Sequence, residues 1–571
     1  MRPFSRTRFW AVAALWLATA GGFCSAAPAA RQLPPVILIS IDTLRADHVA
    51  AYGYHRIATP NIDSFTQGGT LFASIACQTP LTLPSHMSLF TSTYPFKNGI
   101  QENAELVPPG AVTLAGVLRS RGYKTAAFIG SVFLERQMGL DQGFDTYDSP
   151  FNFEAFSPVS GEMFFGGTEN PYSVRDRRDG ALVVRAALRW MAANREPPVF
   201  VFIHLFDLHT PYSVPEAAAR RKGISRYDAQ LEYEDELIGT LKRALTQGGW
   251  WDRSLSVLLS DHGEGLGDHG ETSHGYFIYQ STLHVPLIFH WPAGFTGQPS
   301  RVQRPAGLID VAPTILNFLG LPVPACFEGA SLLGAPPRTV YSESLHTHDS
   351  FGWAPLRSVR RGAYKYIEAP GPELYNLEKD PEERNNIFHA DPGLARELRA
   401  ELAELLARYG RRGSSPAAGA TPRTERLLAS LGYLAPGPPA RVAGSGPDPK
   451  DRLQEYRLYE KATAAIEDHR LDTAASLLVQ VLRQDAANVL ARRDLGVCYL
   501  DLHYYSKARS SFEQVLAAAP DDYPSQFGLG LADERLGLLD EARAHLESAC
   551  RIAPRASQCR RELDALKQRA N

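Results

Sequence analysis

The chain has 571 residues, enough for about three or four ordinary domains or for one large domain with an appendage. Apolar residues make up 44% and charged residues 21%, which is the composition of a globular protein and excludes a wholly disordered chain. The net charge of −3 provides no overall basic field, so we expect no nucleic-acid partner, and six cysteines are too few for a disulfide-stapled scaffold.

Residues 1–30 have the order of a secretory signal. Arg2, Arg6 and Arg8 precede an apolar run over residues 9–23, and small residues follow it. The run is shorter than the roughly 20 residues of a membrane span. We therefore expect export to the periplasm or the cell exterior with cleavage of the signal; an uncleaved N-terminal anchor is the alternative. No later stretch is long and apolar enough to span a bilayer.

Residues 31–435 are predicted to form one α/β domain, because strand-like apolar runs alternate there with helical patterns. The clearest runs are Val36–Ile41, Val199–Ile203 and Leu255–Ser260. Nearly continuous apolar strands are buried on both faces, so they belong in a largely parallel central sheet that helices cover.

These three runs end in residue types that bind metals. The residues are Asp42 after the first run, His204, Asp207 and His209 after the second, and Asp261 with His262 after the third. Ligand sites in such sheets lie outside the carboxyl ends of the strands. The three clusters therefore predict one divalent metal site, although they span more than 200 residues of sequence.

The segment that starts at Thr82 has the pattern of a helix N-terminus, with Pro84 in its first turn. In one interpretation Thr82 only caps this helix. In the other, its hydroxyl lies where free N–H groups and the helix dipole favour an anion, and a bound metal makes it an attacking nucleophile.

Residues 436–450 are rich in proline and glycine and are predicted to be a linker, and residues 451–571 repeat with a period of 34. The repeated positions are Leu495 and Leu529, Gly496 and Gly530, Ala508 and Ala542, and Pro520 and Pro554. This pattern resembles the tetratricopeptide repeat, which implies an all-α solenoid. We expect the tail to bind a protein partner or to self-associate, because Tyr499, Tyr504, Tyr505 and Tyr523 are more aromatic residues than a solvated face needs. Cys550 and Cys559 are either a disulfide or two core thiols.

Residues 34–410 resemble the sulfatase family of the alkaline phosphatase superfamily. The most specific segment is Ser260-Asp-His-Gly-Glu-Gly-Leu-Gly-Asp-His-Gly270, and two later segments, at 364–367 and 373–382, match the C-terminal part of the family. The resemblance implies a small α+β subdomain over about 340–410.

The resemblance also implies roles for single residues. Asp42, Asp261 and His262 resemble the principal metal ligands of the family, with Thr82 on the same ion. Asn103 follows Thr82 at the spacing of an amide that steadies the oxygens of the transferred group.

Two histidines complete the implied site. His274 follows His262 by 12 residues, where sulfatases carry a lysine and phosphoethanolamine transferases a histidine, and His209 resembles its partner. The pair could hold a second metal or contact the leaving group, with Asp207 as a further ligand candidate. Three more histidines are expected to be structural: His204, His269 and His290.

Four departures from the sulfatase pattern set the expected reaction. Thr82 cannot become formylglycine, His86 stands at the arginine position, Thr43 replaces an aspartate, and Gly130–Phe133 replaces a segment that contacts sulfate. A metal-bound threonine is typical of related nucleotide pyrophosphatases and phospho-group transferases. Because those transferases carry several transmembrane helices and this chain has none, we expect a hydrolase of phosphate diesters or of phosphonate or phosphate monoesters.

Three alternatives remain open: a sulfuric ester hydrolase acting on a sulfated glycan or aryl sulfate, a phospho-group transferase, and a non-catalytic tetratricopeptide scaffold. The resemblance implies one or two divalent ions. Aspartate, histidine and threonine ligands favour zinc or manganese over calcium, which prefers oxygen ligands alone, and we expect zinc.

Overall fold

The fold is that of a computed structural model, which describes residues 33–103, 105–151, 177–196, 198–334, 336–409, 446–552 and 557–569. The predicted signal at 1–30 and most of the predicted linker, 436–445, lie outside these residues. Among the described residues, no helix combines the length and the apolarity that a bilayer crossing needs.

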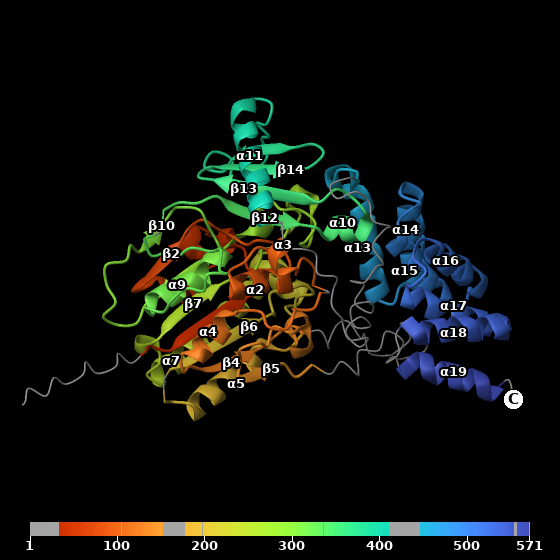
Figure 1. Cartoon of the computed structure of the whole chain (residues 1–571), viewed down its shortest axis with the longest axis horizontal. Coiled ribbons are helices and arrows are strands. Elements are labelled where there is room, and N and C mark those ends of the chain that lie inside the picture. Colours follow the sequence, from red (N-terminus) through yellow and green to blue (C-terminus); the bar gives the residue numbers. More distant parts are fainter. Residues whose placement is uncertain are drawn as a thin grey trace, which may run out of the picture.

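A central sheet of eight strands has the order β10-β2-β9-β7-β1-β6-β4-β5 (Figure 1). The five strands from β7 to β5 pair in parallel, and β9 is antiparallel to both β7 and β2. The predicted, largely parallel sheet is therefore confirmed. The strands are β1 Val36–Ile41, β2 Gly69–Phe72, β4 Lys124–Phe128, β5 Thr146–Asp148, β6 Val199–Leu205, β7 Leu255–Leu259, β9 Leu287–His290 and β10 Arg301–Val302. A second, small sheet consists of β11 Ala306–Gly307, β3 Ile75–Ala76 and β8 His284–Val285.

Helices cover both faces of the central sheet, as the apolar strands require (Figure 1). Alternate residues of β1 and β6, such as Leu38 and Phe202, pack with α2 Thr82–Thr91, α4 Leu114–Ser120 and α9 Val311–Phe318. Their neighbours in sequence, such as Ile39 and Ile203, pack with α5 Gly180–Ala193 and α7 Arg226–Gln247. Shorter helices are α1 Pro60–Asp63, α3 Pro95–Asn98, α6 Glu216–Lys222 and α8 Gln280–Leu283.

A subdomain with an antiparallel sheet of four strands follows, in the order β12-β13-β14-β15. The strands are β12 Val340–Ser344, β13 Leu356–Arg361, β14 Tyr364–Glu368 and β15 Glu373–Asn376. Helix α11 Pro392–Tyr409 packs on this sheet through Leu398 and Leu402, and α10 His346–Phe351 connects β12 to β13. This is the α+β part that the sequence predicts.

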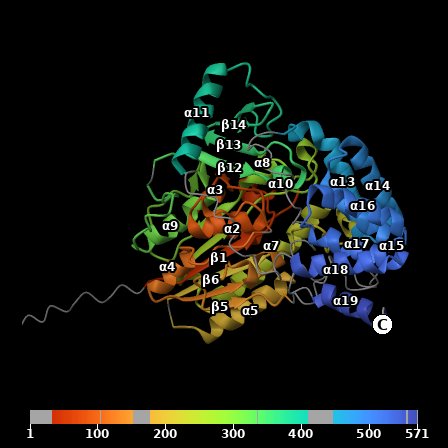
Figure 2. The same ribbon diagram turned by 45° about the vertical axis from the view of Figure 1, so that its right-hand side comes forward.

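The tail is a stack of helices beside the large domain (Figure 2). They are α13 Leu453–Glu467, α14 Leu471–Gln484, α15 Val489–Asp501, α16 Tyr505–Ala518, α17 Tyr523–Leu536, α18 Leu539–Ile552 and α19 Ser557–Arg569. The repeated glycines allow close helix contacts, because a Cβ on Gly496 would lie 2.7 Å from the ring of Phe512, and one on Gly530 would lie 2.8 Å from Leu546. The all-α solenoid is therefore confirmed.

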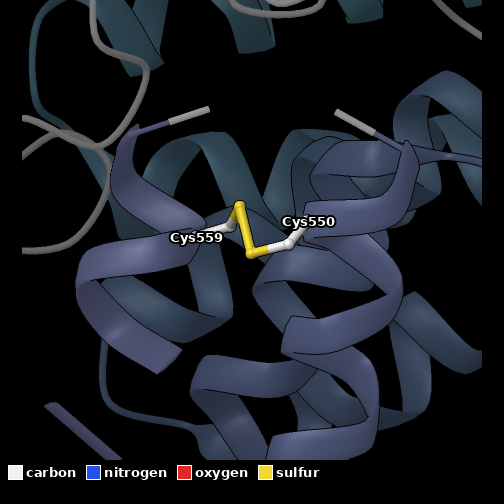
Figure 3. Close-up of a disulfide and its surroundings, with 2 residues drawn as sticks. All are labelled: Cys550 and Cys559. Carbon is white, nitrogen blue, oxygen red and sulfur yellow. A yellow bond between two sulfur atoms is a disulfide. The ribbon is translucent and has the colours of Figure 1, made fainter. Parts of the chain in front are cut away.

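Of the two states left open for Cys550 and Cys559, the structure has the disulfide, which joins α18 to α19 (Figure 3). We expect Cys559→Ser to lower the free energy of unfolding of the tail by about 2.5 kcal/mol, because the unfolded chain gains conformational entropy once the disulfide no longer closes a short loop. Urea unfolding followed by circular dichroism measures this. Cys326→Ser, at an exposed free cysteine, is the control, and equal stability of the two variants would contradict the prediction.

Candidate active site

The carboxyl ends of three strands bring the predicted ligands together. β1 lies between β6 and β7, with Ser40 opposite both His204 and Leu259. The chain then continues into Asp42 after β1 and into Asp261 and His262 after β7, and all three side chains are fully buried. Parallel pairing thus puts residues more than 200 positions apart at one edge of the sheet.

Asp42, Asp261 and His262 form a group whose ligand atoms lie within 4.8 Å of one another. His262 Nε2 lies 3.9 Å from Asp42 Oδ1 and 3.6 Å from Asp261 Oδ2. Among the described residues, neither of these two oxygens has a hydrogen-bond partner. Two unpaired buried carboxylate oxygens and one imidazole nitrogen therefore face a common point.

The chemistry of this group fits a divalent cation. His262 Nδ1 lies 3.0 Å from Gly263 O and donates to it, which leaves the Nε2 lone pair free as a ligand. Burial raises the pKa of Asp42 to about 6, and burial beside Asp42 also raises the pKa of Asp261. Ionised carboxylates in such surroundings need a positive charge nearby, and a bound cation would supply it.

Thr82 is the first residue of α2, and its hydroxyl points at this group. Its Oγ1 lies 3.4 Å from both Asp42 Oδ2 and His262 Nε2. The helix is capped by another residue, since Leu83 N donates to Asn103 Oδ1 at 2.9 Å. The hydroxyl of Thr82 is therefore not engaged in capping, and the buried amide of Asn103 is fixed beside it at the helix N-terminus.

His209 and His274 adjoin the group, as the resemblance implies. The ring of His274 lies 4.4 Å from that of His262 and 5.1 Å from that of His209. His209 Nδ1 donates to Thr210 O, and His274 Nδ1 lies 3.1 Å from Glu264 Oε1. Burial lowers the pKa of His274 to about 4 and lowers that of His209 as well, so both rings are neutral and present Nε2.

Asp207 does not join the group. Its Oδ1 accepts from Gly180 N at the start of α5, and burial beside other carboxylates raises its pKa to about 6. The turn after β6 carries it to the side of the sheet that α5 and α7 cover, whereas His209 returns to the site. We therefore leave Asp207 out of the ligand set, which corrects the expectation from the sequence.

Two further histidines contact the site, one of which the sequence predicted to be structural. His204 Nε2 lies 3.3 Å from Asp42 Oδ2. His86 Nδ1 lies 2.7 Å from Thr82 O, and its Nε2 lies 3.0 Å from Ser40 Oγ. With Asp261, the two form a second group within 4.8 Å, but both nitrogens of His86 are already hydrogen-bonded. His86 therefore supports Thr82 rather than holding an ion.

Burial lowers the pKa of His86 and His204 to about 4, so both rings are neutral. A signal for them is present in the sequence. Ser40 and His204 each lie two residues after Leu38 and Phe202, so their side chains point to the same face of the sheet, which α2 covers. His86 follows Thr82 by one helical turn and therefore lies on the same side of α2.

The other two histidines that the sequence predicted to be structural lie apart from the site, in agreement with that prediction. His269 stacks on Tyr279, and His290 stacks on Trp251 and donates from Nδ1 to Gln67 O at 3.0 Å.

Residues 34–321 match the Sulfatase family, and residues 267–411 match the family described as N-sulphoglucosamine sulphohydrolase, C-terminal. The chain belongs to the sulfatase family. It is a hydrolase of sulfuric or phosphoric ester bonds, and the dependence of this family on a divalent metal agrees with the ligand group at Asp42, Asp261 and His262. Residues 465–524 and 500–557 match the tetratricopeptide repeat, which confirms the second resemblance.

Similar proteins are mainly sulfatases. The Delta 4,5-hexuronate-2-O-sulfatase of Bacteroides thetaiotaomicron is 25% identical over 462 residues, which cover 68% of this chain and 90% of that protein. Human arylsulfatase A is 24% identical, over 68% of this chain and 89% of its own. Among solved structures, the phosphonate monoester hydrolase of Agrobacterium radiobacter has a TM-score of 0.54 at 22% identity and covers 66% of this chain and 96% of that one. A 2-O GAG sulfatase has a TM-score of 0.54 at 21% identity and covers 73% of this chain and 99% of that one.

Proposed function

We propose that this sulfatase-family hydrolase cleaves its ester by direct attack of Thr82 Oγ1 on the central atom of the ester group. The observation that carries the proposal is the position of Oγ1, 3.4 Å from both Asp42 Oδ2 and His262 Nε2 and at the N-terminus of α2. Asp42, Asp261 and His262 would hold a divalent cation, zinc in the first place and manganese or calcium otherwise. Such an ion supplies Lewis acidity that favours the ionised hydroxyl.

Other residues of the site orient Thr82, stabilise the charge on the ester group and transfer the proton. His86 holds the Thr82 carbonyl and so fixes the first turn of α2. The amide of Asn103 and the helix N-terminus stabilise the non-bridging oxygens of the ester group. The ester bond to the leaving oxygen breaks as the bond to Thr82 Oγ1 forms, and the proton that the Thr82 hydroxyl loses passes through the neutral Nε2 of His274 or His209 to that oxygen. Water then cleaves the threonine ester and restores the hydroxyl.

Two ester classes compete, and the relatives favour a sulfate ester. Similar proteins carry names of glycan and aryl sulfatases, so the sulfuric ester alternative has better support than the phosphate ester that the sequence led us to expect. We place a sulfated glycan first among candidate substrates.

The nucleophile favours the second class, a phosphate diester or a phosphate or phosphonate monoester. Thr82 cannot be oxidised to formylglycine, and His86 stands where the maturation motif has arginine. An unmodified hydroxyl that attacks phosphorus forms a phospho-threonine, which water hydrolyses.

Parallel turnover of an aryl sulfate, an aryl phosphate monoester and a phosphate diester separates these classes. Full-length protein is loaded in turn with zinc, manganese and calcium, and Thr82→Ala serves as the blank. Sulfate turnover that the variant lacks supports the first class, and phosphate turnover that it lacks supports the second. Absence of turnover on all three contradicts the proposal and favours a transferase or a scaffold.

Asn103 can be tested for two roles separately. We expect Asn103→Asp to keep the cap of α2, because a carboxylate oxygen still accepts from Leu83 N, but to lower kcat by about 100-fold through loss of an amide donor to the anion. Thermal unfolding and steady-state kinetics measure the two effects. A variant with unchanged kcat would remove Asn103 from the mechanism.

We also propose that the chain is exported and that its tail binds a protein partner or a second copy. The basic and apolar start of the chain and the Cys550–Cys559 disulfide support an oxidising compartment outside the cytoplasm. On the tail, Tyr523 is buried in the helix core, whereas Tyr504 is 49% exposed and available to a partner. Unchanged complexes and an unchanged mass in solution after deletion of residues 436–571 would contradict tail-mediated binding.

A further inference from the structure

The first helix of the tail, α13, packs on the active-site loop that carries His274. Arg457 Nε donates to Gly270 O at 2.9 Å, and Thr272 Oγ1 donates to Glu460 Oε2 at 2.8 Å. Both loop residues lie within four positions of His274. The tail therefore contacts the outside of the same loop whose inside faces the ligand group.

A second set of contacts anchors α13 at the end of this loop. Tyr276, which is fully buried, donates from its hydroxyl to Pro449 O at 2.7 Å, and its ring lies 3.9 Å from the ring of Tyr456. On α10, Phe351 meets Tyr459 with ring centroids 5.5 Å apart. Figures 1 and 2 both show α13 beside α10. The helix is thus fixed to the large domain on two sides.

Hydrogen bonds across the loop join its outer and inner residues. Gly265 N donates to Ser273 O at 2.6 Å, and Gly267 N donates to Glu271 O at 2.7 Å. The buried Glu271 accepts in turn from Tyr276 N at 2.7 Å. Gly270 and Thr272 are therefore connected through hydrogen bonds within the loop to the residues that flank His274.

Gly270 shows how close the helix lies. Its φ is +85°, and a Cβ at this position would overlap the guanidinium of Arg457 and the side chain of Leu453. Gly267, in the same loop, has a φ of +96° and nothing within 4 Å of such a Cβ. Of these two glycines, only Gly270 would press a Cβ against the side-chain ends of Arg457 and Leu453 on α13, and Gly267 offers a matched control.

We infer that α13 is a positioning element of the active site: Arg457 and Tyr456 hold the loop so that His274 lies against His262 and His209. The inference rests on the role of His274 in the proposed function. It makes the start of the tetratricopeptide tail a part of the catalytic unit, in addition to any partner that the tail binds.

The test compares full-length variants in kinetics and in hydrogen–deuterium exchange. We expect Arg457→Ala and Gly270→Ala to lower kcat by about 10- to 100-fold with KM changed less than about threefold, since displaced catalytic groups slow the reaction more than they weaken binding. Exchange of the amides of residues 267–276 is expected to rise about 10-fold or more. Arg457→Lys, which keeps a donor for Gly270 O, is expected to recover most of both losses.

Two controls complete the test. Gly267→Ala has the same backbone strain without the contact, and Arg492→Ala removes hydrogen bonds that lie within the tail. Arg457→Ala with unchanged kcat, or with loop exchange equal to that of the native chain, would overturn the inference. Hydrogen–deuterium exchange alone tests whether α13 holds the loop. A native chain that turns over no ester would therefore contradict the proposed function, and the exchange of the loop amides would still test the packing of α13.

Discussion

Replacing Thr82 by alanine is expected to lower kcat by at least about 1,000-fold for whichever sulfate or phosphate ester the native protein hydrolyses. Oγ1 is the atom that attacks in the proposed reaction, and a methyl group cannot replace it. The fold should survive, because the hydroxyl takes no part in capping α2, where Leu83 N is bonded to Asn103 Oδ1. Steady-state kinetics of the metal-loaded variant, with its melting temperature, measure both expectations.

Two substitutions control this result. Thr82→Ser keeps a hydroxyl at the first position of α2 and should retain turnover within about 10- to 100-fold of the native value. Thr91→Ala, at the other end of the same helix, removes a hydroxyl that donates to Met87 O at 2.7 Å and should leave kcat within about twofold. Native-like turnover by Thr82→Ala would show that another group attacks, and the proposed mechanism would then be wrong.

The central sheet and the principal metal ligands could be predicted because they depend on patterns among residues that are neighbours in sequence. The strands before Asp42 and Asp261 are apolar except at Ser40 and Ser256, so burial on both faces and a common edge followed directly. The 34-residue spacing of Gly496 and Gly530 predicted the solenoid for a similar reason, because small residues recur at each close contact between helices.

Other features could not be predicted because they depend on contacts between distant segments. Asp207 and His209 lie two residues apart, yet the turn after β6 directs the first to Gly180 N and the second to the site. The packing of α13 on Gly270 joins segments almost 190 residues apart, and no sequence pattern marks which face of a repeat meets another domain. His204 is the intermediate case, since its strand parity indicated the face but not its contact with Asp42.

Removal of divalent ions is expected to abolish turnover and to lower the free energy of unfolding. Ion binding to the folded chain alone stabilises it by about 2.7 kcal/mol at a free concentration 100 times Kd, and the carboxylates of Asp42 and Asp261 lose that compensation when the ion leaves. Because burial raises the pKa of Asp42 to about 6 without the ion, protons should compete more strongly as the pH falls through that value, so that ion affinity decreases. Calorimetric titration of chelator-treated protein at pH 5 and pH 7.5 measures this.

A matched pair of variants tests which carboxylates hold the ion. Asp261→Asn removes a charge whose Oδ2 faces His262 Nε2 at 3.6 Å, so affinity should fall by about 100-fold or more. Asp207→Asn removes a charge from the same edge of the sheet, but from a carboxylate bonded to Gly180 N, and it should bind the ion as the native chain does. Equal losses in the two variants would show that Asp207 is a ligand after all, because no other described contact connects it to the group. A loss confined to Asp261→Asn would establish that the ion lies on the α2 side of the sheet, where Thr82 can reach it.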